Sequence, residues 1–200
     1  MAPLDGDPLD PDRSRVARRD LDTTEDRFST VSTRPGRSAD DIPVAKTPPG
    51  GYGTTFPDLI LAGCPEPLVA GAPDLRGLWQ VVEVQAGGKI APDHPALGHL
   101  QRVEQCGDRL VVTAGGVIHD MRCDGNPEHG VRDVAEFDKQ TPITVIASYE
   151  DGVHVLKPVG IPVEVTRKRD GADMIWDYVG FRARLHRIGP PETELPEACK

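Results

Sequence analysis

Aromatic side chains in one alternating run are the residues of this chain whose type and spacing could hold a small molecule. Met174, Trp176 and Tyr178 lie two residues apart, so an extended strand places all three on one face. If that face points inward, it supplies a wall for a ligand, with the indole N–H and the phenol hydroxyl as polar handles. Ordinary core packing explains the same alternation.

Imidazoles are the next candidates, because they titrate near neutral pH and can donate, accept or bind a metal. His119 shares the face of its run with Val117 and Met121, and on an inward face it would stand in an apolar cavity. His154 could act in the same way as a proton donor or ligand, and Tyr149 is a further aromatic candidate for the wall. For each histidine, the alternative is a hydrogen-bonded or exposed side chain without a function.

No spacing in the chain is typical of a metal site, a nucleophile elbow, a phosphate loop or a dinucleotide fingerprint. Six side chains could in principle bind a metal ion together, but their spacing does not force them to converge on one point: His94, His99, Cys106, His119, Cys123 and His129. No cofactor is therefore predicted, and haem or a metal ion is kept only as an alternative. Four carboxylates could act as acids or bases if they turned inward, although alternation favours the solvent face for them: Glu83, Glu136, Glu164 and Asp177.

A basic run, Thr166-Arg167-Lys168-Arg169, ends one predicted strand beside the turn at Asp170-Gly171. It could grip an anionic ligand or partner. We favour a structural interpretation, in which charges protect the end of a hairpin from pairing with other chains.

The elements that must position these residues are short strands. Period-two alternation, rich in Val, Ile and Thr, predicts eight to ten strands at 76–85, 99–106, 109–114, 117–123, 131–137, 143–149, 153–157, 163–168, 174–179 and 181–188. Glycine beside an acidic residue at 106–108, 150–152 and 170–172 favours hairpins between neighbours. The sequence therefore predicts an all-β, antiparallel up-and-down barrel over residues 74–188, which leaves no exposed edges once closed. Residues 87–98 are predicted as a loop or helical plug, and Gly180 as a bulge or bend.

The first predicted strand carries Gly77-Leu78-Trp79, and the last carries Arg182 and Arg184. A Gly-x-Trp at the start of such a barrel, with an arginine on the last strand, resembles the lipocalin and calycin superfamily. The resemblance implies that Trp79 plugs the closed end and that Arg184, or Arg182, lies over it. The chain lacks the glycine-rich continuation of nitrobindin-like haem barrels, which argues against haem. Because the secretory signal and disulfides of extracellular lipocalins are also not expected, the resemblance favours an intracellular calycin or a barrel-shaped cyclase.

Outside the barrel, the sequence predicts a disordered or extended arm over residues 1–73 and a flexible tail over residues 189–200. The arm holds many Asp-Pro, Arg-Ser and Pro-Gly clusters and too little apolar surface to fold alone. Residues 52–68 differ, because apolar side chains are interleaved with prolines there. We expect this segment to dock, either as a lid over the barrel mouth or on a partner.

Charge and cysteine usage exclude several classes of protein. The net charge of −9 and the pI near 5.1 argue against nucleic-acid or anionic-membrane binding. The first residues are acidic and lack the apolar stretch of a secretory signal. The four cysteines are irregularly spaced and are predicted to be reduced, so a cytoplasmic protein is expected.

Three functions remain open at this level. The first is an intracellular carrier that binds a small, largely apolar molecule. The second is a cyclase or isomerase that shapes a polyene or polyketide into reactive geometry, using Trp176, Tyr178 or Tyr149. The third is an assembly subunit whose residues 1–73 bind a larger protein complex.

Overall fold

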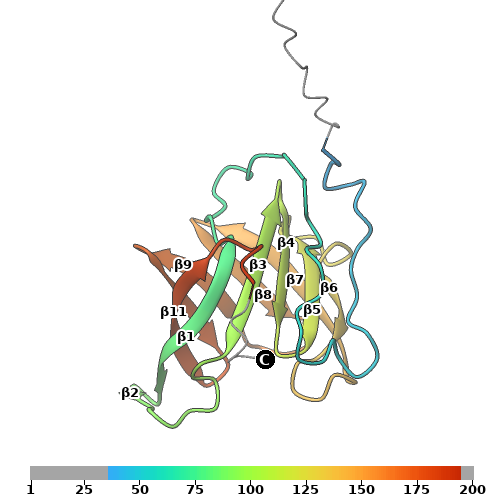
Figure 1. Cartoon of the computed structure of the whole chain (residues 1–200). Coiled ribbons are helices and arrows are strands. Elements are labelled where there is room, and N and C mark those ends of the chain that lie inside the picture. Colours follow the sequence, from blue (N-terminus) through green and yellow to red (C-terminus); the bar gives the residue numbers. More distant parts are fainter. Residues whose placement is uncertain (1–35, 195–200) are drawn as a thin grey trace, which may run out of the picture. The chain divides into compact units, whose positions relative to one another are not determined.

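The structure, a computed structural model, describes residues 36–194 of the chain (Figure 1). This part contains eleven β-strands and no helix. The strands are β1 (Gly77–Ala86), β2 (Lys89–Ile90), β3 (Leu100–Cys106), β4 (Arg109–Ala114), β5 (Val117–Arg122), β6 (Val131–Val134), β7 (Pro142–Glu150), β8 (Val153–Pro158), β9 (Val165–Asp170), β10 (Asp173–Tyr178) and β11 (Phe181–Gly189). The predictions for residues 1–35 and 195–200 lie outside the described residues. No helix in the described part is long and apolar enough to cross a bilayer.

The strands form one antiparallel meander that closes on itself. Their order is β5-β4-β3-β1-β11-β10-β9-β8-β7-β6, and β2 pairs only with β1. The first strand meets the last along most of its length, from Leu78 opposite Gly189 to Ala86 opposite Phe181. Between β5 and β6 the ladder is replaced by a few contacts, such as the Arg122 N–H donating to the His129 carbonyl at 2.9 Å. The predicted up-and-down barrel is therefore confirmed, and it is nearly closed.

Tight turns account for the sequential pairing. In the β7–β8 hairpin, Asp151 and Gly152 both have positive φ angles, 48° and 78°, which an acidic residue followed by glycine tolerates. Gly180, predicted as a bulge or bend, lies in the turn between β10 and β11, with φ 87°. The register shifts lie between β1 and β11, at Leu78–Trp79 and at Val81–Glu83. On its other side β1 pairs with both β2 and β3.

Alternation gives the barrel an apolar interior. The inward side chains form one continuous cluster: Trp79, Val81, Val84, Val103, Leu110, Val112, Met121, Val145, Ala147, Leu156, Val165, Met174, Trp176, Ala183 and Leu185. We call the end with the β4–β5, β6–β7, β8–β9 and β10–β11 connections the mouth, and the opposite end the closed end. The predicted loop at 87–98 contains β2, and its Ala96 and Leu97 pack against the interior near the mouth.

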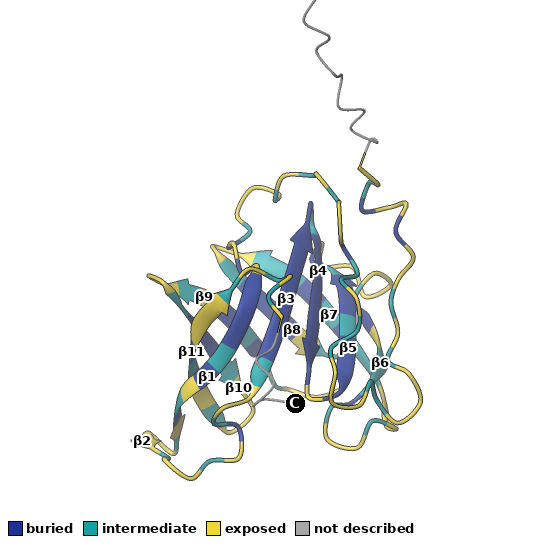
Figure 2. Cartoon of the chain, in the orientation of Figure 1, coloured by how far each residue is buried: buried dark blue, intermediate teal, exposed yellow. Residues whose placement is uncertain are grey.

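Residues 36–69 run along the outside of the barrel, and we call this segment the strap (Figure 1). Its Ala39, Ile42 and Leu61 form a second apolar cluster with outward side chains of β3, β4 and β5, including Val111 and Ile118. Strand β4 is consequently buried on both faces (Figure 2). Residues 52–68, which were expected to dock as a lid over the mouth or on a partner, therefore pack on the outer wall of their own barrel through Tyr52, Ile60, Leu61 and Cys64.

A buried ion pair clamps the strap to that wall. Arg109 on β4 donates to both carboxylate oxygens of Asp120 on β5, at 2.8 and 2.7 Å. The same guanidinium donates to the carbonyls of Ala39, Ile42 and Pro43 at 2.6–2.9 Å. Arg109 and Asp120 occupy outward positions, which alternation assigns to solvent, but in the structure they hold the backbone of the strap.

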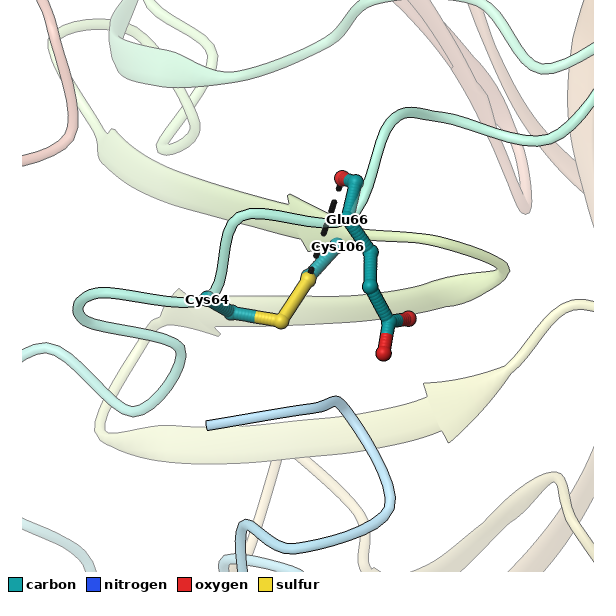
Figure 3. Close-up of side chains that lie close together, drawn as sticks. All are labelled: Cys64, Glu66 and Cys106. Atoms are coloured by element: carbon teal, nitrogen blue, oxygen red, sulfur yellow. Dashed lines mark hydrogen bonds between the residues drawn. A yellow bond between two sulfur atoms is a disulfide. The ribbon is translucent and has the colours of Figure 1, made fainter. Parts of the chain in front are cut away.

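A disulfide joins the strap to β3. Cys64 and Cys106 are bonded, with their Cα atoms 6.1 Å apart, and the Glu66 carbonyl oxygen lies 3.9 Å from the Cys106 sulfur (Figure 3). The prediction of four reduced cysteines is therefore wrong for this pair. It missed the bond because the two residues are 42 positions apart and are brought together only by the strap. Cys123 is free and buried, as an apolar filler would be.

Candidate functional site

The aromatic face predicted from alternation points into the barrel. Met174 and Trp176 are buried in the interior cluster, and Tyr178 is 36% exposed at the mouth. Trp176 lies 4.9 Å from Tyr178 and 5.2 Å from Phe181, measured between ring centroids. His94 from the β2–β3 loop stacks against Phe181 at 4.6 Å. An aromatic group therefore leads from the mouth towards the middle of the barrel.

Beneath this group, an arginine crosses the interior. Arg167 on β9 is 5% exposed, and its Nε donates to the Oε1 of Gln101 on β3 at 3.2 Å. Its guanidinium also lies 5.3 Å from the ring of Trp176. Since three strands separate β3 from β9 along the sheet, this contact spans the barrel.

Donor groups around Arg167 lack partners. Within residues 36–194, no hydrogen bond is made by Nη1 of Arg167, Nε1 of Trp176 or either ring nitrogen of His154. The three residues form one transverse row, because Arg167 pairs with His154 on β8 and with Trp176 on β10. A buried polar group without a partner costs about 1–3 kcal/mol, and more when it is charged. Such groups are typical of places that receive a ligand or water.

Burial also sets the charges in this row. It lowers the pKa of Arg167 to about 10, although the negative charge of Glu136 opposes the shift. His154 is fully buried, and first burial and then the Arg167 charge hold its pKa well below the usual value. At neutral pH the row therefore carries one positive charge, on Arg167, beside a neutral imidazole.

Tyr149, a predicted ligand residue, continues the row on β7, because it pairs with His154 and their ring centroids are 6.0 Å apart. It also belongs to a hydrogen-bond network towards the closed end. The Gln105 side chain donates to the Tyr149 hydroxyl at 2.9 Å and accepts from the Leu75 N–H at 2.6 Å. Burial raises the pKa of Tyr149, and it raises the pKa of Cys123 to about 12. The network holds the segment that precedes β1 across this end of the barrel.

Trp79 lies in the same region and is fully buried. Its Nε1 donates to the Leu75 carbonyl at 2.8 Å. The guanidinium over its ring, 5.0 Å away, belongs to Arg169 on β9. The last-strand Arg184 points outward and pairs with Asp170 and Asp173, and Arg182 pairs with Asp177. Arg184 and Arg182 therefore do not lie over Trp79, and the β11 residue opposite Trp79 in the ladder is Arg187.

His119 points towards the seam between β5 and β6. Its Nε2 lies 3.0 Å from the Val134 carbonyl oxygen, and burial lowers its pKa. This hydrogen bond helps to join two strands that share no ladder, so the residue has a structural partner that the sequence did not reveal.

The metal ligands considered from sequence do not come together. In the described part of the chain, one group of three such side chains has its ligand atoms within 4.8 Å of one another: Cys64, Glu66 and Cys106 (Figure 3). Its two sulfurs are bonded to each other, and a disulfide sulfur is not the thiolate that a metal requires.

The fold and the buried row define an antiparallel, nearly closed β-barrel with a polar centre, an architecture consistent with the calycin-like resemblance. No family model matches the chain, and no curated protein or solved structure is similar enough to count as a match. Function must therefore be argued from the site itself.

Proposed function

We propose that this barrel binds a small, largely apolar molecule, which passes the mouth and rests against the aromatic group. The observation that carries the proposal is the group of large apolar side chains exposed around the mouth, namely Ile90, Phe137, Val159, Ile161 and Val179. Such surface is typical of binding sites, and Val179 follows Tyr178 directly in the chain.

Binding is favoured over catalysis by the state of the interior groups. Neither ring nitrogen of His154 has a partner among the described residues, so this imidazole lacks the orienting carboxylate of an acid–base pair. A role for the strap in partner binding is disfavoured, because its apolar residues and backbone groups are engaged on the outer wall. The disulfide fits an oxidising compartment better than the predicted cytoplasm.

The test uses N-phenyl-1-naphthylamine, a neutral dye that fluoresces in apolar surroundings, titrated against the full chain. We expect saturable binding, and Tyr178→Ala should weaken it by about tenfold, as for loss of one aromatic contact. Ile188→Ala is the matched control, because Ile188 is also exposed but lies near the closed end. Absence of saturable binding, or equal effects of the two substitutions, would contradict the proposal.

A further inference from the structure

The two parts of the strap are attached to the barrel by different means. The first part, residues 38–47, is held by the buried pair of Arg109 and Asp120, and the Arg109 guanidinium makes five hydrogen bonds, as many as its N–H groups allow. The second part, residues 52–66, contains one buried residue, Leu61, and a disulfide joins it to β3. The second part therefore has a covalent bond where the first part has a complete set of hydrogen bonds.

The outer wall beneath the second part contains buried polar atoms without partners. Arg102 and Glu104 on β3 and Thr113 on β4 face outward, and none of them is more than 6% exposed. Nε of Arg102 and Oε1 of Glu104 form an ion pair at 3.5 Å, but neither atom makes a hydrogen bond within residues 36–194. The Thr113 hydroxyl, opposite Arg102 in the ladder, has no partner there either. These atoms would gain water if the second part moved away from the wall.

Few hydrogen bonds join the second part to this wall. Nη2 of Arg102 donates to the carbonyls of Pro57 and Asp58 at 2.7 and 3.2 Å. The Leu61 N–H donates to Oε2 of Glu104 at 2.8 Å. Water can replace each of these bonds once the groups are exposed, so their net contribution is small. The disulfide is therefore the main restraint on the second part.

We propose that the Cys64–Cys106 disulfide is a redox latch, and that its reduction releases residues 52–66 from β3 and β4 while residues 38–47 stay in place. Release gives water to the unpartnered atoms of the wall, whereas opening of the first part would break the hydrogen bonds of a buried charge. The latch lies on the outside of the barrel and does not depend on what the interior binds. In the reduced chain, the outer faces of β3 and β4 become accessible to other molecules.

The accessible sulfur sets the direction of the reaction. Cys64 lines a cavity of about 350 Å³, whereas Cys106 is fully buried (Figure 3). A thiolate of an external dithiol therefore attacks Sγ of Cys64, the S–S bond breaks, and Cys106 leaves as a thiolate that takes up a proton. The second thiol of the reductant then displaces Cys64, which also takes up a proton, and the reductant becomes a cyclic disulfide. Two electrons and two protons pass from the dithiol to the protein.

The experiment measures amide hydrogen exchange in the full chain by NMR, before and after reduction with dithiothreitol and without denaturant. The amide of Leu61 reports on the second part, and those of Ala45 and Thr47, which donate to Asp120 and Asp133, report on the first. We expect reduction to accelerate exchange at Leu61 at least about tenfold more than at the other two amides. Cys64→Ala should exchange as the reduced chain does and should not respond to dithiothreitol.

A pair of substitutions tests why the second part is released. Thr113→Val removes one unpartnered hydroxyl from the wall, so in the reduced chain it should slow exchange at Leu61 by about fivefold, as for one buried polar group. Thr113→Ser keeps the hydroxyl and should not slow it. Equal acceleration of both parts on reduction would overturn the latch, as would an unchanged rate at Leu61 or in Thr113→Val. A bond that dithiothreitol leaves intact in the folded chain would overturn it too, because the reaction requires an accessible Cys64.

Discussion

Replacing Asp120 by alanine should test whether the strap is held by the buried clamp. The substitution removes both anionic acceptors of Arg109, whose side chain is 3% exposed. It also removes the acceptor of the Ala45 N–H, which donates to Asp120 at 2.8 Å. Loss of one partner from a buried pair costs about 3–5 kcal/mol. That is a large part of the roughly 5–15 kcal/mol that stabilises an ordinary domain.

The assay is urea unfolding followed by tryptophan fluorescence, since both tryptophans lie in the barrel interior. Asp40→Ala is the matched control, because Asp40 is also in the strap but its pair with Arg122 is exposed on the aspartate side. We expect the control to cost less than about 1 kcal/mol. The double variant Arg109→Met with Asp120→Ala should cost less than the sum of the two single changes, since the second change removes a charge left unpaired by the first.

The clamp does not hold the strap if the free energy of unfolding of Asp120→Ala lies within about 1 kcal/mol of the wild-type value. Strict additivity in the double variant would refute it as well. Either result would mean that solvent reaches the guanidinium or that the strap is held by its apolar contacts alone.

Two further predictions concern the disulfide and the buried imidazole. Reducing the Cys64–Cys106 bond should lower stability by roughly 4 kcal/mol, because it closes a loop of 42 residues in the unfolded chain; matching urea midpoints with and without reductant would argue against this cross-link. The pKa of His154 is depressed in the folded state, so below about pH 6.5 the unfolded chain takes up a proton that the folded chain does not. Stability should therefore fall with decreasing pH by up to about 1.4 kcal/mol per unit from this residue. His154→Met should remove that part of the slope, and unchanged acid unfolding in the variant would show that His154 is not the cause.

The barrel could be predicted from sequence because its signals are local. Alternation within each strand and glycine turns between strands fix which neighbours pair, and the meander contains no distant pairing except β1 with β11. Most strand ends lie within one residue of the predicted ones, whereas β9 begins and ends two residues later than predicted. β6 ends at Val134, three residues early, because residues 135–139 form a turn closed by the Lys139 N–H and the Ala135 carbonyl.

The candidate site was predicted only in part. Parity along β10 placed Met174, Trp176 and Tyr178 together, and the structure shows that face inward. Arg167 was assigned to hairpin protection, although it has the same parity as the inward Val165. Its even spacing from Val165 was the signal that Arg167 points inward, but the charge of arginine favoured an assignment to the solvent face. Docking of residues 52–68 was expected, but its place on the outer wall was not, because the partners there lie on outward faces of β3, β4 and β5 that alternation assigns to solvent.

The strap gives the barrel a wall of unequal thickness. Strands β3 and β4 are covered on both sides, whereas β9, β10 and β11 expose parts of their outer faces (Figure 2). We expect amides in the covered strands to exchange mainly through global unfolding, and those in the single-layer strands through smaller openings as well. The row of His154, Arg167 and Trp176 lies in the single-layer half, so hydrogen exchange should be faster around the buried charge than in β3 and β4.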